Sequence, residues 1–359
     1  MVTPPAGAVD GPGPRCAAVL ESVAGQVPPR VVGNAELPTA WEVDDAWVRR
    51  RTGIGARHWA DPGTSTGDLA LGAAEQALAA AGRPLVDVVL VATSTPDHPM
   101  PAMAPRLATR LGQGGAAAFD VSAACSGFVY GLATAAGLIC GGLAGRVLLV
   151  AAEVYSTLTD PADRSTGAVF ADGAGAVVLR RGELGEPGSL LAFDLGSDGG
   201  GHDLITVPGG GARDRADPGR YGPGDRYFRM NGREVFQHAV TRMTESSLAV
   251  LKNAGWAAAE VDRFVAHQAN ARILSAVGER LGIPAARQVG NIARAGNTGA
   301  ASVPLALADA SSRSALHVGE KVLITSFGAG LTWGSAVLSW PDLPPAPPVH
   351  PAGVPPLDN

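Results

Sequence analysis

The chain has little of what secreted and membrane proteins need. It has only three cysteines in 359 residues, Cys16, Cys125 and Cys140. An odd number without metal-like spacing argues against a disulfide framework and favours reduced intracellular thiols. The N-terminus lacks a basic segment followed by an apolar stretch, so we expect no secretion signal. The apolar stretch 131–145 is shorter than the roughly 20 residues of a spanning helix. We therefore expect a cytoplasmic protein that does not associate with a membrane.

Charge is also scarce. Charged residues make up 17% of the chain, the formal net charge is −5 and the pI is about 5.8. This balance gives no global attraction to nucleic acid, so we expect no nucleic-acid partner. Apolar periodicity is missing at both ends, 1–15 and 342–359, which are rich in Pro and Gly. We predict that both ends are disordered tails.

Two patterns recur in the chain at a constant separation. VDVVLVA at 86–92 is answered by VDRFVAH at 261–267, and the apolar run that begins at Val147 is answered at the same separation by one that begins at Val322. Short buried strands alternate with Ala-rich helices in both copies, which indicates α/β layers with covered sheets. We therefore predict two duplicated halves, 16–185 and 186–341. We expect the Gly- and Asp-rich segment 196–228 to be a surface insertion.

Cys125 lies where an apolar strand, AAFDV, gives way to a helical pattern, GFVYGLATAAGLI. A sulfur near a helix N-terminus is favoured as thiolate, the form a nucleophile needs. A small buried hydrophobe in a tight turn is the alternative, because free Cys is among the most buried residue types.

The repeat brings two further residues into question. The same separation carries Ser122 onto Asn297, and His267 ends the strand of the second copy. Taken singly, His267 would be a structural residue and Asn297 a turn or helix cap. If the halves pack about a pseudo-twofold axis, however, both residues converge on Cys125, and this favours a catalytic site.

Four segments resemble the signature blocks of β-ketoacyl-acyl-carrier-protein synthase III, a thiolase-fold condensing enzyme. They are SAACSGFVYGL, VAHQANARIL, AGNTGAASVPLAL and SFGAGLTWGSAVL. The resemblance spans about residues 31–340. It implies a five-layered αβαβα fold, a homodimer, and a catalytic triad of Cys125, His267 and Asn297, with the nucleophile in the N-terminal half and the other two in the C-terminal half.

The resemblance also implies the chemistry. Cys125 accepts an acyl primer from a coenzyme A or carrier-protein thioester, with the backbone N–H groups of Cys125 and Ala329 as oxyanion donors. Neutral His267 and Asn297 then stabilise the enolate formed when a malonyl-acyl-carrier-protein loses carbon dioxide. The product is a β-ketoacyl thioester that initiates fatty acid or polyketide synthesis. Coenzyme A and phosphopantetheine thioesters are substrates, and we expect no metal and no permanently bound cofactor.

Binding residues are carried over in the same way. The resemblance places Trp47, Arg51 and Arg164 around the coenzyme A adenine, and a second group along the pantetheine tunnel: Met230, Gly232, Phe236 and Asn270. Carrier-protein docking is expected to use Arg272, Arg233 or Arg49. Met100 stands where the family usually has Phe in the acyl pocket, and the loop that carries it reaches the pocket of the neighbouring subunit. Because Met is flexible, we expect medium or branched primers to compete well with acetyl.

Two other functions stay open at this point. Enzymes on the same scaffold transfer an acyl group to an oxygen, a nitrogen or a carrier thiol without losing carbon dioxide. Non-catalytic partner subunits also resemble ketosynthases, although they lack the cysteine that this chain keeps as Cys125.

Overall fold

The computed structural model describes residues 15–217 and 219–350, whose strands form two large sheets. The first sheet has the order β1-β7-β6-β4-β5 and the second the order β11-β12-β13-β8. The strands of the first sheet are β1 (Cys16–Gln26), β4 (Val88–Ala92), β5 (Ala117–Val121), β6 (Arg146–Val154) and β7 (Asp172–Glu183). Those of the second are β8 (Leu190–Ser197), β11 (Arg263–Ala266), β12 (Lys321–Gly328) and β13 (Thr332–Ser339). β4 and β6 are continuous apolar runs because both faces of their sheet are covered.

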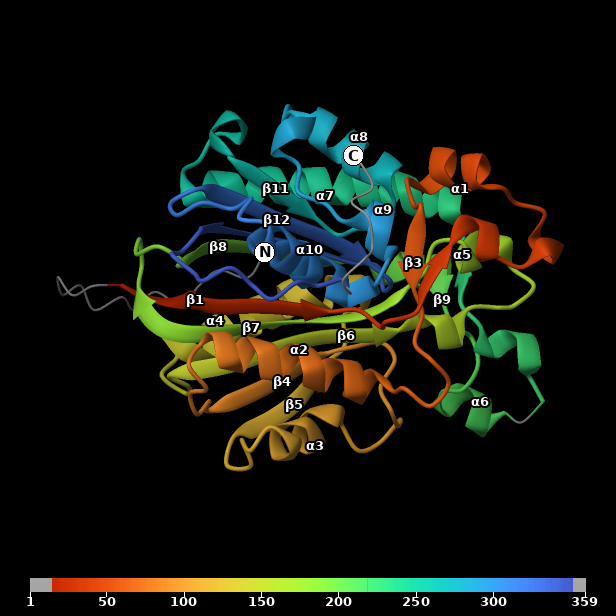
Figure 1. Cartoon of the computed structure of the whole chain (residues 1–359), viewed down its shortest axis with the longest axis horizontal. Coiled ribbons are helices and arrows are strands. Elements are labelled where there is room, and N and C mark those ends of the chain that lie inside the picture. The colour runs from red at the N-terminus through yellow and green to blue at the C-terminus, as the bar shows by residue number, and fades with distance from the viewer. Residues whose placement is uncertain (1–14, 218, 351–359) are drawn as a thin grey trace.

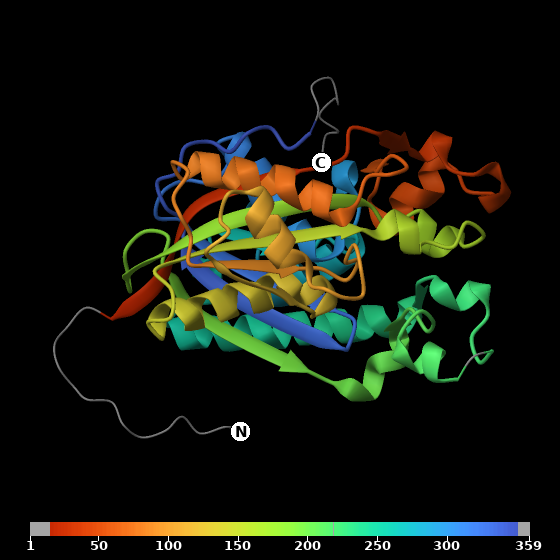
Figure 2. The ribbon, with the colours of Figure 1, turned by 90° about the horizontal axis from the view of Figure 1, so that it is seen from below.

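Helices cover and separate the two sheets. α2 (Thr66–Ala80) and α3 (Met103–Arg110) pack on the outer face of the first sheet, as the view from below shows in orange (Figure 2). α7 (Gly232–Ala254) and α8 (Ala271–Leu281) cover the second sheet on the opposite side of the molecule (Figure 1). α4 (Gly127–Cys140) and α10 (Ser302–Ser312) contribute to one apolar core shared by both sheets. The predicted five-layered αβαβα fold is confirmed.

The duplication is visible in the elements next to the candidate site. The short helical turn η3 (Ala124–Ser126) leads into α4, and η9 (Gly299–Ala301) leads into α10. The two turns begin at Ala124 and Gly299, and the two helices begin at Gly127 and Ser302. Both pairs have the same separation along the chain as the repeated patterns in the sequence. The two central helices therefore start at equivalent points, and this places their N-terminal turns close together.

Shorter elements surround this frame. Five of them lie between β1 and α2: β2 (Val31–Gly33), η1 (Asn34–Glu36), η2 (Thr39–Trp41), α1 (Asp45–Thr52) and β3 (Ala56–His58). Between β6 and β7 lie η4 (Tyr155–Leu158) and α5 (Arg164–Gly167), and between α7 and α10 lie η7 (Ala258–Glu260), η8 (Ala285–Arg287) and α9 (Ile292–Ala295).

The segment 196–228 is more than the surface insertion that we expected. It forms η5 (Gly199–Leu204), β9 (Ile205–Thr206), α6 (Ala212–Ala216) and η6 (Pro223–Arg226), and β9 pairs with β10 (Arg229–Met230). α6 lies at one end of the molecule (Figure 1). Ile205 and Phe228 are buried, because these two apolar side chains turn inward and join the core of the second half. The insertion therefore supplies part of the interior.

The predicted disorder of 342–359 is wrong for residues 342–350. Leu343, Ala346 and Val349 pack against the central core, and the prolines between Ala346 and Val349 are exposed. The packed residues recur every three positions, which is the repeat of a polyproline II helix. Patterns that identify strands and α-helices have periods of 2 and 3.6, so they do not reveal this repeat. We call residues 341–350 the C-terminal strap. Residues 1–14 and 351–359 of the predicted tails lie outside the described residues.

The strap ends at a buried polar cluster. His350 Nδ1 lies 3.2 Å from His58 Nε2, and His350 Nε2 lies 4.0 Å from the Asp309 carboxylate on α10. Burial, followed by the nearby Arg294, His58 and Arg313, lowers the pKa of His350 to about 3. The strap is therefore fixed with this histidine neutral.

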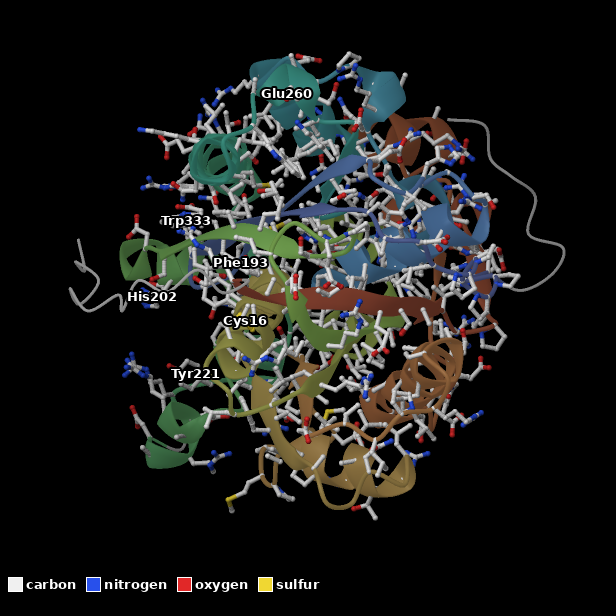
Figure 3. All side chains as sticks on the ribbon, turned by 90° about the vertical axis from the view of Figure 1, so that its left-hand side faces the viewer. Cys16, Phe193, His202, Tyr221, Glu260 and Trp333 are labelled. Carbon is white, nitrogen blue, oxygen red and sulfur yellow. The ribbon has the colours of Figure 1, made fainter. Side chains whose placement is uncertain are left out.

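The other two cysteines lie far from Cys125. Cys140 ends α4, and Cys125 precedes the opposite end of that helix, so the full length of α4 separates the two residues. Cys16 begins β1 and lies on the side of the molecule that Figure 3 shows. The sulfur of Cys140 lies 3.3 Å from the carbonyl oxygen of Cys16. Across 15–217 and 219–350, no helix is long and apolar enough to cross a membrane.

Candidate active site

Cys125 lies in the η3 turn between β5 and α4, as the sequence predicts. The preceding residue, Ala124, has φ = 46°, a left-handed conformation that costs a non-glycine residue about 1–2 kcal/mol. A methyl group at Gly328, the last residue of β12, would lie 2.7 Å from the Cys125 backbone nitrogen. Strain on one side and a tight backbone contact on the other therefore fix the position of Cys125. Such strain is typical of functional sites.

The thiol of Cys125 is not the thiolate that the helix N-terminus led us to expect. Burial, followed by the nearby Glu153 carboxylate, raises its pKa to about 12, although Tyr155 acts in the opposite direction with its hydroxyl 4.0 Å from the sulfur. Glu153 is itself fully buried at the end of β6, and burial raises its pKa to about 7. Desolvation and a like charge outweigh the helix dipole here, so the resting Cys125 side chain is a thiol.

His267 directly follows β11 and is 3% exposed. Its Nδ1 lies 2.6 Å from the Ser302 hydroxyl at the start of α10. Burial lowers the pKa of His267 to about 4, because the apolar surroundings disfavour the charged imidazolium. His267 is therefore neutral at pH 7.

Asn297 lies between α9 and η9 and is held by both ends of its amide. Its Oδ1 accepts a hydrogen bond from the Gly299 backbone N–H at 3.0 Å, and its Nδ2 donates to the Ala269 carbonyl at 3.4 Å. The amide nitrogen carries two hydrogens, so one stays available for a ligand. Asn297 is 5% exposed and rigidly oriented.

These three residues line one cavity of about 120 Å³. They reach it from three separate segments: the turn before α4, the residue after β11 and the loop before η9. The remainder of its lining is mostly apolar: Val169, Phe170, Ile205, Phe228, Val235, Ala239, Met243, Ala269, Ile273 and Phe327. Such a lining excludes water and strengthens every hydrogen bond formed inside. Met230, Gly232, Asn270 and Gly328 complete it.

A second, more open cavity of about 430 Å³ continues from the first. It is lined by Arg51, Gly232, Arg233, Phe236, Gln237, Asn270 and Arg272. Gly232 and Asn270 belong to both cavities. The predicted tunnel residues thus mark a path from the surface to Cys125, with cations at its mouth.

Trp47 lies beside this mouth, with two guanidinium groups close to its indole ring. The Arg51 guanidinium carbon is 4.4 Å from the centre of the indole ring, and that of Arg164 is 5.6 Å from it. Cations over an indole face form a flat, positively charged stacking surface. The three residues predicted to contact adenine therefore lie together.

Met100 and Arg49 are placed less favourably for their predicted roles, whereas Ala329 stays compatible with its role. Met100 is 85% exposed and does not line the cavity of its own chain. Arg49 is paired with Asp45 at 2.8 Å, so its charge is already neutralised. Ala329 adjoins Gly328 and is partly exposed, with φ outside the left-handed region, so its N–H can donate as in an ordinary turn.

Sequence reasoning missed Glu153, Tyr155 and Ser302. Glu153 accepts hydrogen bonds from the Ser94 N–H at 3.0 Å and the Thr95 hydroxyl at 2.9 Å, and its charge acts on the Cys125 thiol. A carboxylate that ends the apolar run RVLLVAAEV is the signal that would have identified it. Ser302 carried no such signal, because its role depends on a contact between α10 and β11.

Comparisons with known proteins agree on one family. Residues 119–199 match the family model described as 3-Oxoacyl-[acyl-carrier-protein (ACP)] synthase III, and residues 251–340 match the model of its C-terminal part. The chain is 55% identical over 327 residues to beta-ketoacyl-[acyl-carrier-protein] synthase III 5 of Streptomyces coelicolor, which covers 91% of this chain and 98% of that protein.

Solved structures are similar over the same extent. The crystal structure of 3-oxoacyl-(acyl carrier protein) synthase III from Pseudomonas aeruginosa PAO1 has a TM-score of 0.86 at 50% identity, covering 91% of this chain and 99% of that one. The priming β-ketosynthase of the R1128 polyketide biosynthetic pathway has a TM-score of 0.85 at 33% identity, covering 94% and 99%.

Proposed function

The chain belongs to the β-ketoacyl-acyl-carrier-protein synthase III family, and from this premise we propose that it condenses an acyl primer with a malonyl-acyl-carrier-protein. The product initiates a fatty acid or a polyketide. The observation that carries the proposal is the single apolar cavity in which the Cys125 thiol, neutral His267 and the Asn297 amide meet. A nucleophile and two neutral hydrogen-bond donors suit acyl transfer followed by enolate formation.

In the loading step, Cys125 Sγ attacks the carbonyl carbon of the primer thioester. A carbon–sulfur bond to Cys125 forms, the bond to the coenzyme A sulfur breaks, and the thiol proton leaves with coenzyme A. The backbone N–H groups of Cys125 and Ala329 stabilise the intermediate oxyanion. The tight contact between Gly328 and the Cys125 nitrogen supports this role, because it aligns the two segments that carry those donors.

In the condensing step, the malonyl thioester loses carbon dioxide and becomes an enolate. His267 and Asn297 donate hydrogen bonds to the enolate oxygen, and neither is acidic enough to protonate the carbon. That carbon attacks the acyl group on Cys125, the carbon–sulfur bond breaks, and the sulfur takes up a proton from water. The raised pKa of Cys125 favours this return to the thiol.

The substrate thioesters enter through the basic mouth. Trp47, Arg51 and Arg164 bind the coenzyme A adenine, and Met230, Gly232, Phe236 and Asn270 contact the pantetheine arm. The flanked indole and the two cavities that share Gly232 and Asn270 support these assignments. No permanently bound cofactor takes part in the proposed reaction.

An acidic carrier protein docks at the same mouth. Arg233 and Arg272 are exposed there, and together with Arg51 they make the rim positive on a chain whose net charge is −5. Arg49 takes a smaller part because Asp45 already pairs with it. The proposed reaction and the reduced cysteines fit a cytoplasmic location.

The functional unit is a homodimer formed through β5. This strand is at the edge of its sheet and is partly exposed, with Phe119 at 40%. An exposed apolar edge strand can pair with its own copy about a twofold axis. Met100 follows the neighbouring strand β4, so in such a dimer it closes the acyl pocket of the other subunit and limits primer length.

Product mass tests the proposal. The chain is incubated with a panel of acyl-coenzyme A primers and malonyl-acyl-carrier-protein. Condensation yields a carrier thioester heavier by one acetyl unit, with one carbon dioxide released per product. An acyl group that moves unchanged to another acceptor would instead identify a plain acyltransferase.

A further inference from the structure

Ser302 lies against the imidazole of His267, at its Nδ1 nitrogen. Its hydroxyl oxygen is 2.6 Å from His267 Nδ1 and 3.2 Å from the backbone nitrogen of Gln268. Ser302 is the first residue of α10 and is 1% exposed, so water does not compete for these bonds. The environment of one ring nitrogen of His267 is therefore set by this hydroxyl.

The hydrogen bonds of that hydroxyl decide which ring nitrogen carries the proton. The Gln268 N–H can only donate, so the Ser302 oxygen accepts from it. If Nδ1 carried the imidazole proton, the oxygen would accept a second time. The hydroxyl hydrogen would then need another acceptor, and within residues 15–217 and 219–350 the structure provides no further partner for it.

The opposite arrangement satisfies both the Ser302 hydroxyl and His267 Nδ1, and it leaves an Nε2–H donor available to a ligand. The Ser302 hydroxyl donates to Nδ1 and accepts from Gln268, and the proton of the neutral ring stays on Nε2. Buried polar groups in native proteins are nearly always paired, so this arrangement is strongly favoured.

We propose that Ser302 is a positioning residue that holds His267 as the tautomer with its proton on Nε2. The inference rests on the proposed function for its consequence, because an Nε2–H donor is what the enolate oxygen requires. A lone pair at Nε2 would face the enolate oxygen and repel it. Ser302 therefore acts through His267 on decarboxylation, while the attack of Cys125 on the primer does not depend on it.

The first test measures the tautomer itself. The chain contains seven histidines, so uniform labelling with ¹⁵N-histidine gives a small set of signals in a two-dimensional ¹H–¹⁵N spectrum of two-bond and three-bond couplings. The His267 signals are those missing in His267→Gln. We expect Nε2 to be protonated and Nδ1 to be an unprotonated acceptor in the wild-type chain. A protonated Nδ1 would overturn the proposal without any further variant.

The second test separates the two half-reactions. In Ser302→Ala we expect both tautomers of His267 in the spectrum. We also expect a fall of about 10- to 100-fold in carbon dioxide release, approaching the loss of one preorganised donor. Acyl loading of Cys125 should stay within about threefold of wild type. Ser302→Thr keeps the hydroxyl and should restore both the spectrum and the decarboxylation rate.

Ser311→Ala is the matched control, because Ser311 is also a buried serine of α10 but accepts a hydrogen bond from Ala346 in the C-terminal strap. It should change neither the tautomer nor the decarboxylation rate. An unchanged tautomer in Ser302→Ala would contradict the proposal. If instead the wild-type chain released no carbon dioxide from malonyl-acyl-carrier-protein, the proposed function would fail while the tautomer result still stood.

Discussion

Gly328 offers a direct test of how Cys125, the proposed nucleophile, is held in place. A methyl group at this position would lie 2.7 Å from the Cys125 nitrogen, 3.0 Å from the Ser126 nitrogen and 3.3 Å from the Cys125 Cα. All three are backbone atoms of the turn that carries the thiol, so no side chain can rotate away to make room. Gly328→Ala must therefore separate the turn from β12.

The size of the separation sets the expected loss. Ordinary van der Waals contact begins near 3.4 Å, so the two segments must move apart by about 0.7 Å. They carry the two proposed oxyanion donors, Cys125 and Ala329. Loss of one such donor, or a misplacement of about 1 Å, costs on the order of 10²-fold in rate. We expect acyl loading and condensation both to fall by at least that factor.

Intact-mass kinetics of acyl loading measure the effect. Gly137→Ala is the matched control, because Gly137 lies in α4 downstream of Cys125 and a methyl group there meets nothing within 4 Å. It should load at the wild-type rate and melt slightly higher, since Ala is the better helix former by about 0.5–1 kcal/mol. Loading by Gly328→Ala within threefold of wild type would refute the account of the oxyanion turn.

Three other parts of the molecule lead to further predictions. Asn297→Ala removes an enolate donor, so acyl-Cys125 should accumulate while carbon dioxide release falls by about 10²-fold; unimpaired release would remove Asn297 from the condensing step. Met100→Trp should shift primer preference toward acetyl in a competition among acyl-coenzyme A primers, whereas an unchanged ranking would show that Met100 does not limit the pocket. The pKa of His350 is lowered from 6.5 to about 3, so between these pH values the unfolded chain binds a proton that the folded chain does not. The free energy of unfolding is therefore fully retained above pH 6.5 and decreases as the pH falls below it. Urea unfolding should show about 2 kcal/mol of this loss by pH 5, and His350→Gln should be less acid-sensitive than wild type; equal sensitivity of the two would mean that the strap histidine is not buried.

The duplicated architecture could be predicted because its signals are local and repeated. Two pairs of strands follow this pattern: β4 and β11, which begin at Val88 and Arg263, and β6 and β12, which contain Val147 and Val322. Both pairs are largely buried, and both have the same separation along the chain. The same separation places Cys125 and Asn297 near equivalent turns before α4 and α10. Periodicity, one constant separation and the assumption of a pseudo-twofold axis thus predict that three residues distant in the sequence converge on one site.

The features that could not be predicted depend on contacts between distant segments. The pKa of Cys125 is raised by burial and, after that, by the Glu153 carboxylate, which reaches Cys125 from a segment that follows α4 in the chain. Ser302 acquires its role only where α10 meets the residue after β11. The strap packs because every third side chain, Leu343, Ala346 and Val349, meets the core that β1 and α10 share. Val349, for example, lies 3.4 Å from the point where a Gly25 side chain would begin.

The most direct test of the central claim follows the mass of the whole chain through one turnover. Incubation with a single acyl-coenzyme A should add one acyl group, located on Cys125 by peptide mapping and absent in Cys125→Ala. Malonyl-acyl-carrier-protein should then remove that group, releasing one carbon dioxide and one β-ketoacyl-acyl-carrier-protein per acyl group lost. Acylation that persists in Cys125→Ala, or deacylation without carbon dioxide, would contradict the account.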